Sequence, residues 1–224
     1  MKDELPSAVG FDLDNTLYEY KPCNVNAINA VRDFITMELN ISDEVFFKKF
    51  NLARSNHKSR VGNIASSHSR LLYFVELLKL FDINDYNLAT KLDKIFWDTY
   101  FEFMHLDKDA LNLLQSIKKC NIKTYILSDL TIDIQHKKLA FLGVEKLFDL
   151  VLTSEEVGSE KPSTRGFIMA SKALNFSLNK SWYIGDSFSK DIISSSSIDI
   201  RGFHISREKG VSFKDINKIL ASIK

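Results

Sequence analysis

Two aspartates at the end of a short apolar segment are the residues whose type and spacing say most about chemistry. The segment reads VGFDLDNTLY and places Asp12 and Asp14 two positions apart. Side chains at positions i and i+2 of an extended strand point the same way, so both carboxylates are expected on one side of the backbone. Two negative charges this close repel unless a cation or a proton separates them. A strand does not need this pair for stability, whereas a magnesium site with a nucleophile and a general acid does.

Three further segments carry hydroxyl, carboxylate or amine groups where predicted strands end. They are Ser128-Asp129, Glu160-Lys161-Pro162, and Gly185-Asp186 with Asp191 one helical turn beyond. Taken singly, such an aspartate commonly caps a helix, such a serine is a loop hydroxyl, and such a lysine is solvated. Ligands bind at the carboxyl ends of the strands in an open parallel sheet. The occurrence of all these segments in order, each after a predicted strand, favours one shared site.

The apolar pattern predicts an α/β fold with a helical insertion. Residues 8–12 read as a buried strand, and residues 22–104 show helical spacing without strand-like alternation. Helices and strands then alternate, which implies a parallel, doubly wound, Rossmann-like sheet. We expect a core domain of residues 1–20 and 105–224 and an inserted four-helix domain of residues 21–104.

The expected helices of the insertion are 24–39, 43–55 with Ser42 as its N-cap, 67–80 and 86–103. The expected later elements are helices 109–119, 132–142, 164–175, 190–195 and 213–223, and strands 123–127, 150–153, 181–184 and 201–205.

Composition excludes several classes of protein. The chain has 224 residues, of which 45% are hydrophobic and 26% charged, and its net charge is +1. No overall field therefore favours nucleic acid or a membrane surface, and the longest apolar runs are far shorter than a membrane span. The start MKDELP lacks the apolar core of a secretory signal. Cys23 and Cys120 are too few for a disulfide framework, so we expect ordinary thiols and a cytoplasmic location.

The four motifs together resemble those of the haloacid dehalogenase superfamily. FDLDNTL is similar to its first motif, LSD to its second, EKP to its third and GDSFSKD to its fourth, and the resemblance covers essentially the whole chain. The helical insertion resembles the small α-helical cap of that family. The segments LGVEKLFDL and TSEEVGSEKP are similar to its phosphatase branch, including N-acylneuraminate-9-phosphatase-like and pyrimidine-nucleotidase-like members.

The resemblance implies a role for each motif residue. Asp12 would be the nucleophile that becomes an aspartyl-phosphate, and Asp14 the acid and base, with its pKa raised towards neutrality by apolar and anionic neighbours. Mg²⁺ would be held by the Asp12 side chain, the Asp14 main-chain carbonyl and the Asp186 side chain. The remaining roles are a loop brace for Thr16, phosphate binding for Ser128, charge neutralisation for Lys161, and orientation of Lys161 or a water by Asp191.

Two motif positions refine this interpretation. Asp129 stands where the wider family often has asparagine, so its side chain is expected to point away and leave only its backbone amide beside the phosphate. Asp14 narrows the range of reactions that the resemblance implies. The family's dehalogenases lack this second acid, and its ion-pumping ATPases carry threonine there. We therefore expect a Mg²⁺-dependent phosphomonoesterase with a small-molecule substrate, as a monomer or homodimer without nucleic-acid or membrane partners.

The insertion contains a basic stretch that suggests a substrate. No acidic residue lies between Glu44 and Glu76, while Lys48, Lys49, Lys58 and several other basic residues do. The stretch is either an anion-binding surface or a solvated helix face with a polar turn. The candidates for substrate binding are Arg60 and His68, followed by Arg54, His57 and Arg70.

Several substrate classes and functions stay open at this point. If the basic surface binds anions, acidic sugar phosphates such as nine-carbon keto-acid phosphates fit, and nucleoside 5′-monophosphates are the next choice. Aromatic residues of the insertion could stack on a base, although their helical spacing favours a core. A sugar-phosphate mutase and a non-catalytic binding protein are the alternatives to a phosphatase.

Overall fold

The computed structural model describes residues 4–206 and 210–223 and divides the chain into two compact units. The first unit comprises Met1–Glu19 and His105–Lys224, and the second comprises Tyr20–Met104. The first three residues of the stretch MKDELP lie outside the described residues. Among the helices described, none has an apolar stretch long enough to cross a bilayer.

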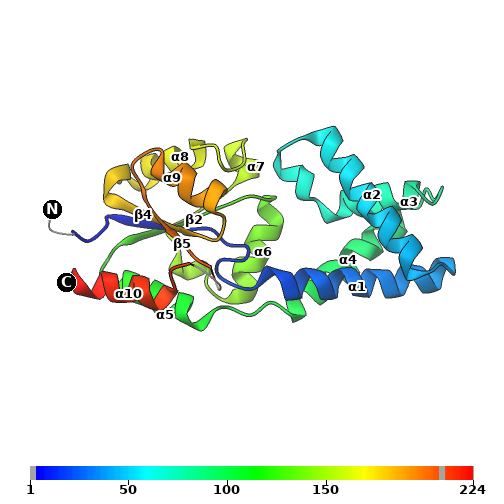
Figure 1. Ribbon diagram of the computed structural model, residues 1–224, viewed down its shortest axis with the longest axis horizontal. Helices are drawn as coiled ribbons and strands as arrows, with labels where there is room; N and C mark the ends of the chain where they lie inside the picture. The colour runs from blue at the N-terminus through cyan, green and yellow to red at the C-terminus, as the bar shows by residue number, and fades with distance from the viewer. Residues whose placement is uncertain (1–3, 207–209, 224) are drawn as a thin grey trace. The chain divides into compact units, whose positions relative to one another are not determined.

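A five-stranded parallel sheet forms the centre of the first unit, as the predicted α/β class requires (Figure 1). Its spatial order is β3-β2-β1-β4-β5, so the first strand in sequence is the middle strand in space. In the register of the sheet, Phe11 of β1 lies opposite Ile126 of β2 and Ile184 of β4. The strands are β1 (Ala8–Phe11), β2 (Lys123–Ser128), β3 (Leu150–Thr153), β4 (Ser181–Gly185) and β5 (Arg201–His204).

Helices cover both faces of this sheet, with α8 and α9 on one side and α5 and α10 on the other (Figure 1). From β1, the strands β2 and β3 follow in one direction across the sheet, and β4 and β5 follow in the other. The direction of winding therefore reverses between β1 and β4, which is where such sheets bind ligands. The helices are α5 (Lys108–Lys119), α6 (Ile132–Leu142), α7 (Ser154–Val157), α8 (Arg165–Leu174), α9 (Ser194–Ser196) and α10 (Phe213–Ser222).

Aromatic side chains pack tightly beside the central strand. A Cβ atom on Gly10 of β1 would lie 2.2 Å from the ring of Tyr125, so only glycine allows that ring its position. Tyr125 stacks on Phe176 with ring centroids 5.5 Å apart, and Phe167 meets Tyr183 edge-on at 4.8 Å. This packing fixes the Tyr183 ring, whose hydroxyl reaches the carboxyl end of the sheet.

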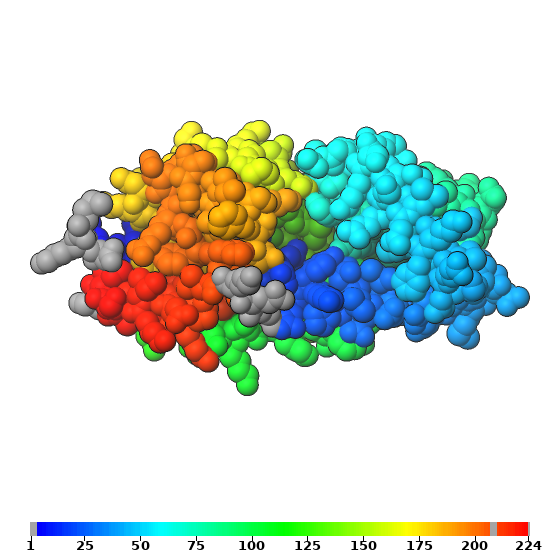
Figure 2. Space-filling model, in the orientation of Figure 1, coloured from blue at the N-terminus to red at the C-terminus, as the bar shows by residue number. Residues whose placement is uncertain are grey.

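The second unit is a helical bundle with an aromatic core. Buried side chains from three of its helices, Phe46, Phe50, Phe74 and Phe96, form a chain of ring contacts between 5.6 and 6.1 Å. This supports the core interpretation of these aromatic residues over a base-stacking one. The space-filling view shows the outer surface of this unit in blue, cyan and green (Figure 2). The elements are α1 (Tyr20–Leu39), α2 (Asp43–Val61), a 3₁₀ turn (Ala65–His68), α3 (Arg70–Lys79) and α4 (Tyr86–Glu102).

Several element boundaries differ from the expected ones. Ser42 caps α2 as predicted, but α2 continues to Val61; its C-cap is Gly62, whose φ of +73° is a positive value that favours glycine. The expected helix 190–195 is instead a π-helical segment, Phe188–Ile193, followed by the short helix α9. The turn α7 was not predicted, because a single helical turn has too few residues to show a period.

Asp149 ties the start of β3 to β2 and α5 and should make stability depend on pH. Its Oδ2 accepts from the Thr124 amide at 2.8 Å, and its Oδ1 accepts from Lys118 Nζ at 2.7 Å. Burial alone would raise the pKa of Asp149, but these hydrogen bonds lower it below its usual range. A lowered pKa in the folded state gives stability that is present above the unfolded-state pKa and is lost as the pH falls.

We therefore expect Asp149→Asn to lower the free energy of unfolding at pH 7 by about 1 kcal/mol. The difference from the wild type should shrink as the pH approaches 3, because the wild-type carboxylate is then protonated. Urea unfolding at pH 7 and at pH 3 measures this difference in the free energy of unfolding. Asp133→Asn, on an exposed carboxylate of α6, is the control. A difference that stays constant with pH would contradict this account.

Candidate active site

Asp12 leaves the central strand where the neighbouring strand β4 also ends. Its backbone amide donates to the Ile184 carbonyl at 2.9 Å, so the sheet pairing itself fixes the start of the loop. Its side chain is only 9% exposed. Thr16, one turn later, donates a 3.2 Å hydrogen bond to Oδ2 of Asp12. The residue expected to brace this loop thus contacts the carboxylate directly.

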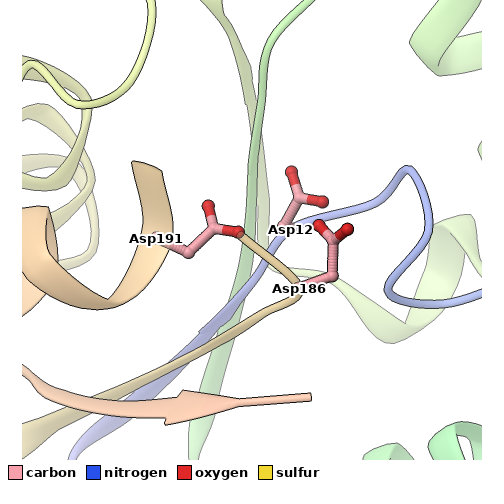
Figure 3. Close-up of side chains that lie close together, drawn as sticks. All are labelled: Asp12, Asp186 and Asp191. Carbon is pink, nitrogen blue, oxygen red and sulfur yellow. The ribbon is translucent and has the colours of Figure 1, made fainter. Parts of the chain in front are cut away.

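Three carboxylates meet at this edge of the sheet (Figure 3). Asp12 follows β1, Asp186 follows β4, and Asp191 lies in the π-helical segment after it; one oxygen of each lies within 4.8 Å of the others. Such a cluster of like charges is unfavourable without a compensating cation. The structure therefore brings together Asp12 and Asp186, the predicted side-chain ligands of a metal, and Asp191, which was predicted to orient Lys161 or a water.

Lys161 forms ion pairs with two of these acids. Its Nζ lies 2.7 Å from Oδ1 of Asp12 and 2.7 Å from Oδ1 of Asp191, and its side chain is 4% exposed. It also donates to the hydroxyl of Tyr183 at 3.1 Å, and that hydroxyl donates in turn to the Leu127 carbonyl. The ammonium is therefore held at a fixed point beside the Asp12 carboxylate.

The charge states of this group follow from burial and from the neighbouring charges. Burial raises the pKa of Asp12 to about 8; Lys161 opposes this rise, and the carboxylates of Asp191 and Asp186 add to it. Burial alone would lower the pKa of Lys161, but its charged neighbours, with Asp12 the largest contribution, raise it well above its usual range. Lys161 therefore stays cationic, and Asp12 ionises fully only where further positive charge is supplied.

A glycine and a backbone amide hold Asp191 in place. A Cβ atom on Gly185 would lie 2.4 Å from the Asp191 carboxylate, so no larger residue fits at the end of β4 without displacing it. The Ser187 amide donates to Oδ2 of Asp191 at 2.9 Å, while Oδ1 holds Lys161. Asp191 thus connects the loop after β4 with Lys161, in the place expected for a residue that orients it.

Asp186 is held by a residue that the sequence interpretation missed. The side-chain amide of Asn15 donates to Oδ2 of Asp186 at 2.7 Å, from a backbone position with φ of +64°. Asparagine tolerates this left-handed conformation better than most residues. Burial raises the pKa of Asp186, and the Asn15 hydrogen bond opposes that rise.

The loop after β2 places Ser128 and Asp129 differently. Ser128 is 1% exposed, and its Oγ accepts from Nε2 of Gln135 at 2.7 Å. The Asp129 carboxylate accepts from the backbone amide of Lys161 at 3.0 Å and from Nζ of Lys190 at 2.9 Å. The Asp129 side chain therefore has protein partners: it fixes the backbone that carries Lys161, and Lys190 balances its charge.

Asp14 differs from the expectation in its electrostatics. Its Oδ1 accepts from Nζ of Lys138 at 2.6 Å and from the Tyr18 hydroxyl, and its Oδ2 accepts from Nε2 of Gln135 at 3.2 Å. Burial would raise the pKa of Asp14, but Lys138, Tyr18 and Gln135 together lower it. The predicted rise towards neutrality is therefore wrong, because the neighbourhood includes a buried cation that the sequence interpretation did not place there.

Comparison with known proteins identifies the family. The model for "Haloacid dehalogenase-like hydrolase" matches residues 9–205, which include all the strand-end residues described above.

The chain belongs to this family.

A ribulose-1,5-bisphosphate 5-phosphatase of Halopiger xanaduensis is 33% identical over 198 residues, covering 88% of this chain and 83% of that protein. A glyceraldehyde 3-phosphate phosphatase of Methanopyrus kandleri is 30% identical over 190 residues, covering 83% and 77%. This haloacid dehalogenase-like hydrolase is therefore a phosphatase, which acts on phosphoric monoesters.

The solved structures agree on the fold. A HAD phosphatase from Thermococcus onnurineus superimposes with a TM-score of 0.73 at 22% identity, covering 95% of this chain and 97% of that one. The magnesium-bound putative hydrolase YfnB from Bacillus subtilis gives 0.72 at 17% identity, covering 97% and 100%. The Rossmann-like, doubly wound core predicted from the sequence is thus the fold of this family.

The donor set fits a hard divalent cation. The clustered side-chain groups of Asp12, Asp186 and Asp191 offer only oxygen ligands, which magnesium prefers, and the cluster offers neither sulfur nor imidazole. The sequence interpretation assigns the metal to Asp12 and Asp186, and it assigns Asp191 to Lys161, which Asp191 contacts at 2.7 Å. The residues present therefore fit Mg²⁺.

The basic candidates of the helical unit have diverse surroundings. Arg60 forms an ion pair with Glu76 at 3.1 Å, and His57 is 1% exposed with its Nε2 2.8 Å from the Ser66 carbonyl. Arg70 donates to the His68 carbonyl and to the Tyr20 hydroxyl. His68 is half-buried and Arg54 is exposed. The stretch is thus neither one cluster nor a uniformly solvated face.

Sequence reasoning missed several polar residues at the site, for reasons that differ. In the sequence, Tyr183 resembles an ordinary aromatic residue of a strand, and Asn15 resembles an ordinary turn residue. Gln135 and Lys138 did leave a signal, because they lie three apart on the same face as buried Ile134 and Leu139. Two polar residues on an apolar helix stripe indicate buried partners.

Proposed function

We propose that this phosphatase is a Mg²⁺-dependent phosphomonoesterase that acts on a short phosphorylated sugar through an aspartyl-phosphate. The observation that supports it most is Lys161, buried 2.7 Å from the Asp12 carboxylate in a cluster of acids that fits a divalent cation. A buried carboxylate beside a fixed ammonium is suited to attack an anionic phosphorus centre, because the ammonium offsets the charge repulsion.

In the first step, an oxygen of Asp12 attacks phosphorus and the bond from phosphorus to the ester oxygen breaks. Lys161 neutralises charge on the carboxylate and the phosphoryl group, held in place by Asp191 and Tyr183. Ser128 Oγ and the backbone amide of Asp129 are assigned to the phosphoryl oxygens. Mg²⁺, held by Asp12, Asp186 and the Asp14 carbonyl, would supply further positive charge at the phosphoryl group.

Asp14 is assigned to proton transfer in both steps. It protonates the departing oxygen in the first step, and it accepts a proton from the water that hydrolyses the aspartyl-phosphate in the second. Its lowered pKa keeps the carboxylate ionised before substrate binds, which is the state that the second step requires. The first step requires the protonated state, which the negative charge of a bound phosphate favours.

The relatives suggest which substrates to try. The two described above are named for phosphorylated sugars of five and three carbons. These are shorter than the nine-carbon keto-acid phosphates and differ from the nucleotides that the sequence suggested. The basic stretch remains the proposed anion-binding surface, and exposed Arg54 is a candidate to bind the second phosphate of a bisphosphate.

Release of inorganic phosphate tests this function. We expect release from ribulose 1,5-bisphosphate or glyceraldehyde 3-phosphate in Mg²⁺ that EDTA reduces by about 10²-fold or more. Nine-carbon keto-acid phosphates, nucleoside monophosphates and 4-nitrophenyl phosphate complete the panel. If a bisphosphate is the substrate, Arg54→Ala should raise its KM while leaving 4-nitrophenyl phosphate unchanged.

Three outcomes would contradict the proposal. Metal-independent release, or no release from any member of the panel, would exclude a Mg²⁺-dependent phosphomonoesterase. Isomerisation of a sugar phosphate without loss of phosphate would instead identify a mutase.

A further inference from the structure

Helix α6 presents a buried lysine and a buried glutamine to the active-site loop. Gln135 is 0% and Lys138 is 1% exposed, and both lie on the face that carries buried Ile134 and Leu139. Burying a lysine ammonium is costly unless a negative group pairs with it. Its partner is Asp14, at 2.6 Å.

The two α6 residues contact different oxygens of that carboxylate. Lys138 Nζ and the Tyr18 hydroxyl both donate to Oδ1 of Asp14, whereas Gln135 Nε2 donates to Oδ2 at 3.2 Å. A carboxylate with donors on both oxygens cannot rotate without losing a hydrogen bond. Its orientation is therefore set by α6 and Tyr18.

Gln135 also connects this carboxylate to the residue assigned to phosphate binding. Its Nε2 lies 2.7 Å from Ser128 Oγ and 3.4 Å from the Asp129 carbonyl, in addition to Asp14. Its Oε1 is a buried oxygen without a hydrogen-bond partner among the residues that the structure describes. An unsatisfied buried acceptor is unfavourable for the fold. The side chain is therefore held by the hydrogen bonds that its Nε2 donates to Asp14 and Ser128.

We propose that Lys138 and Gln135 are positioning residues that hold the Asp14 carboxyl for proton transfer to the leaving group. Lys138 and Tyr18 hold Oδ1 and Gln135 contacts Oδ2, so the carboxyl group that gives its proton to the leaving oxygen has a fixed orientation. In the first step Asp12 bonds to phosphorus, the ester bond breaks, and the leaving oxygen takes that proton. Water then attacks phosphorus, its proton returns to Asp14, and Asp12 is released. This inference rests on the proposed function.

The dependence on the leaving group tests the proposal. A sugar or glycerol phosphate has a poor leaving group that needs a proton, whereas nitrophenolate leaves without one. We expect Lys138→Met to lower kcat/KM about 10²-fold for the alkyl ester and about 3-fold or less for 4-nitrophenyl phosphate. The control is Lys137→Met, the neighbouring lysine, which is 63% exposed and pairs with Asp133; it should change neither value.

Two more variants make the result decisive. Lys138→Gln keeps a neutral donor, and we expect it to fold and to lose less of the alkyl-ester activity than Lys138→Met. In an Asp14→Asn background, Lys138→Met should cause no further selective loss, since it acts through Asp14. Equal losses on both esters, or a selective loss that persists in that background, would overturn the positioning role.

The experiment also separates the inference from the function on which it rests. If Asp14→Asn shows no selectivity for the leaving group, the assignment of Asp14 as proton donor fails. If Asp14→Asn is selective while Lys138→Gln and Lys138→Met are not, the function stands and the role of Lys138 is wrong.

Discussion

Asp12→Asn should reduce phosphate release by about 10⁴-fold or more while leaving the fold intact. The amide is too weak a nucleophile to form an acyl-phosphate. Among the described residues, Asp191 also contacts Lys161, but it lies after β4 and already accepts from the Ser187 amide. Steady-state rates with the best substrate of the panel measure the loss. Asp133→Asn, which removes an exposed carboxylate from α6, should retain full activity.

The same substitution should not lower stability in EDTA. Burial raises the pKa of Asp12, which means that its negative charge is unfavourable in the folded protein, and asparagine is neutral and of the same size. We expect the melting temperature to stay equal or to rise. Mg²⁺ at 100 times its Kd should add about 2.7 kcal/mol to the wild type and much less to the variant. A variant that is strongly destabilised in EDTA, or that keeps full activity, would contradict this interpretation.

The site residues on strand ends could be predicted because topology brings the ends together. Asp12 and Asp186 follow β1 and β4, which are adjacent in space although far apart in sequence. Any parallel sheet that reverses its winding there would make these side chains neighbours. The position of Lys161 could not be predicted from topology, because this residue lies in a loop. The family resemblance predicted its role, and hydrophobic periodicity did not.

The residues that tune the site were harder to predict, and Lys138 is the clearest example. An apolar stripe interrupted by lysine is ordinarily a solvated helix edge, since the long side chain can reach water. The pairing of Lys138 with Gln135 on that stripe indicates buried partners, but only the structure shows that the partner is Asp14, whose pKa is lowered as a result. The predicted length of α2 was wrong for a different reason. The polar residues up to Val61 resemble a linker, but their helical propensity lets the helix continue until Gly62 caps it.

Lys161→Met should reduce both activity and stability, because it removes the positive charge that two buried acids share. We expect a loss of about 10³-fold in kcat. Removing one partner of a buried ion pair costs about 3–5 kcal/mol, since Asp12 and Asp191 are then left without it. Phosphate release and urea unfolding measure the two effects. Lys180→Met, at an exposed pair with Glu4, should cost about 1 kcal/mol or less.

A second substitution separates the two consequences. Adding Asp191→Asn to Lys161→Met removes one of the stranded charges, so part of the lost stability should return, by about 1–2 kcal/mol. Activity should not return, because the ammonium that offsets charge at phosphorus is still absent. If activity recovered together with stability, Lys161 would be only a structural counterion. If neither recovered, the destabilisation would come from lost packing against Tyr183, which Lys161 contacts at 3.1 Å, and electrostatics would not explain it.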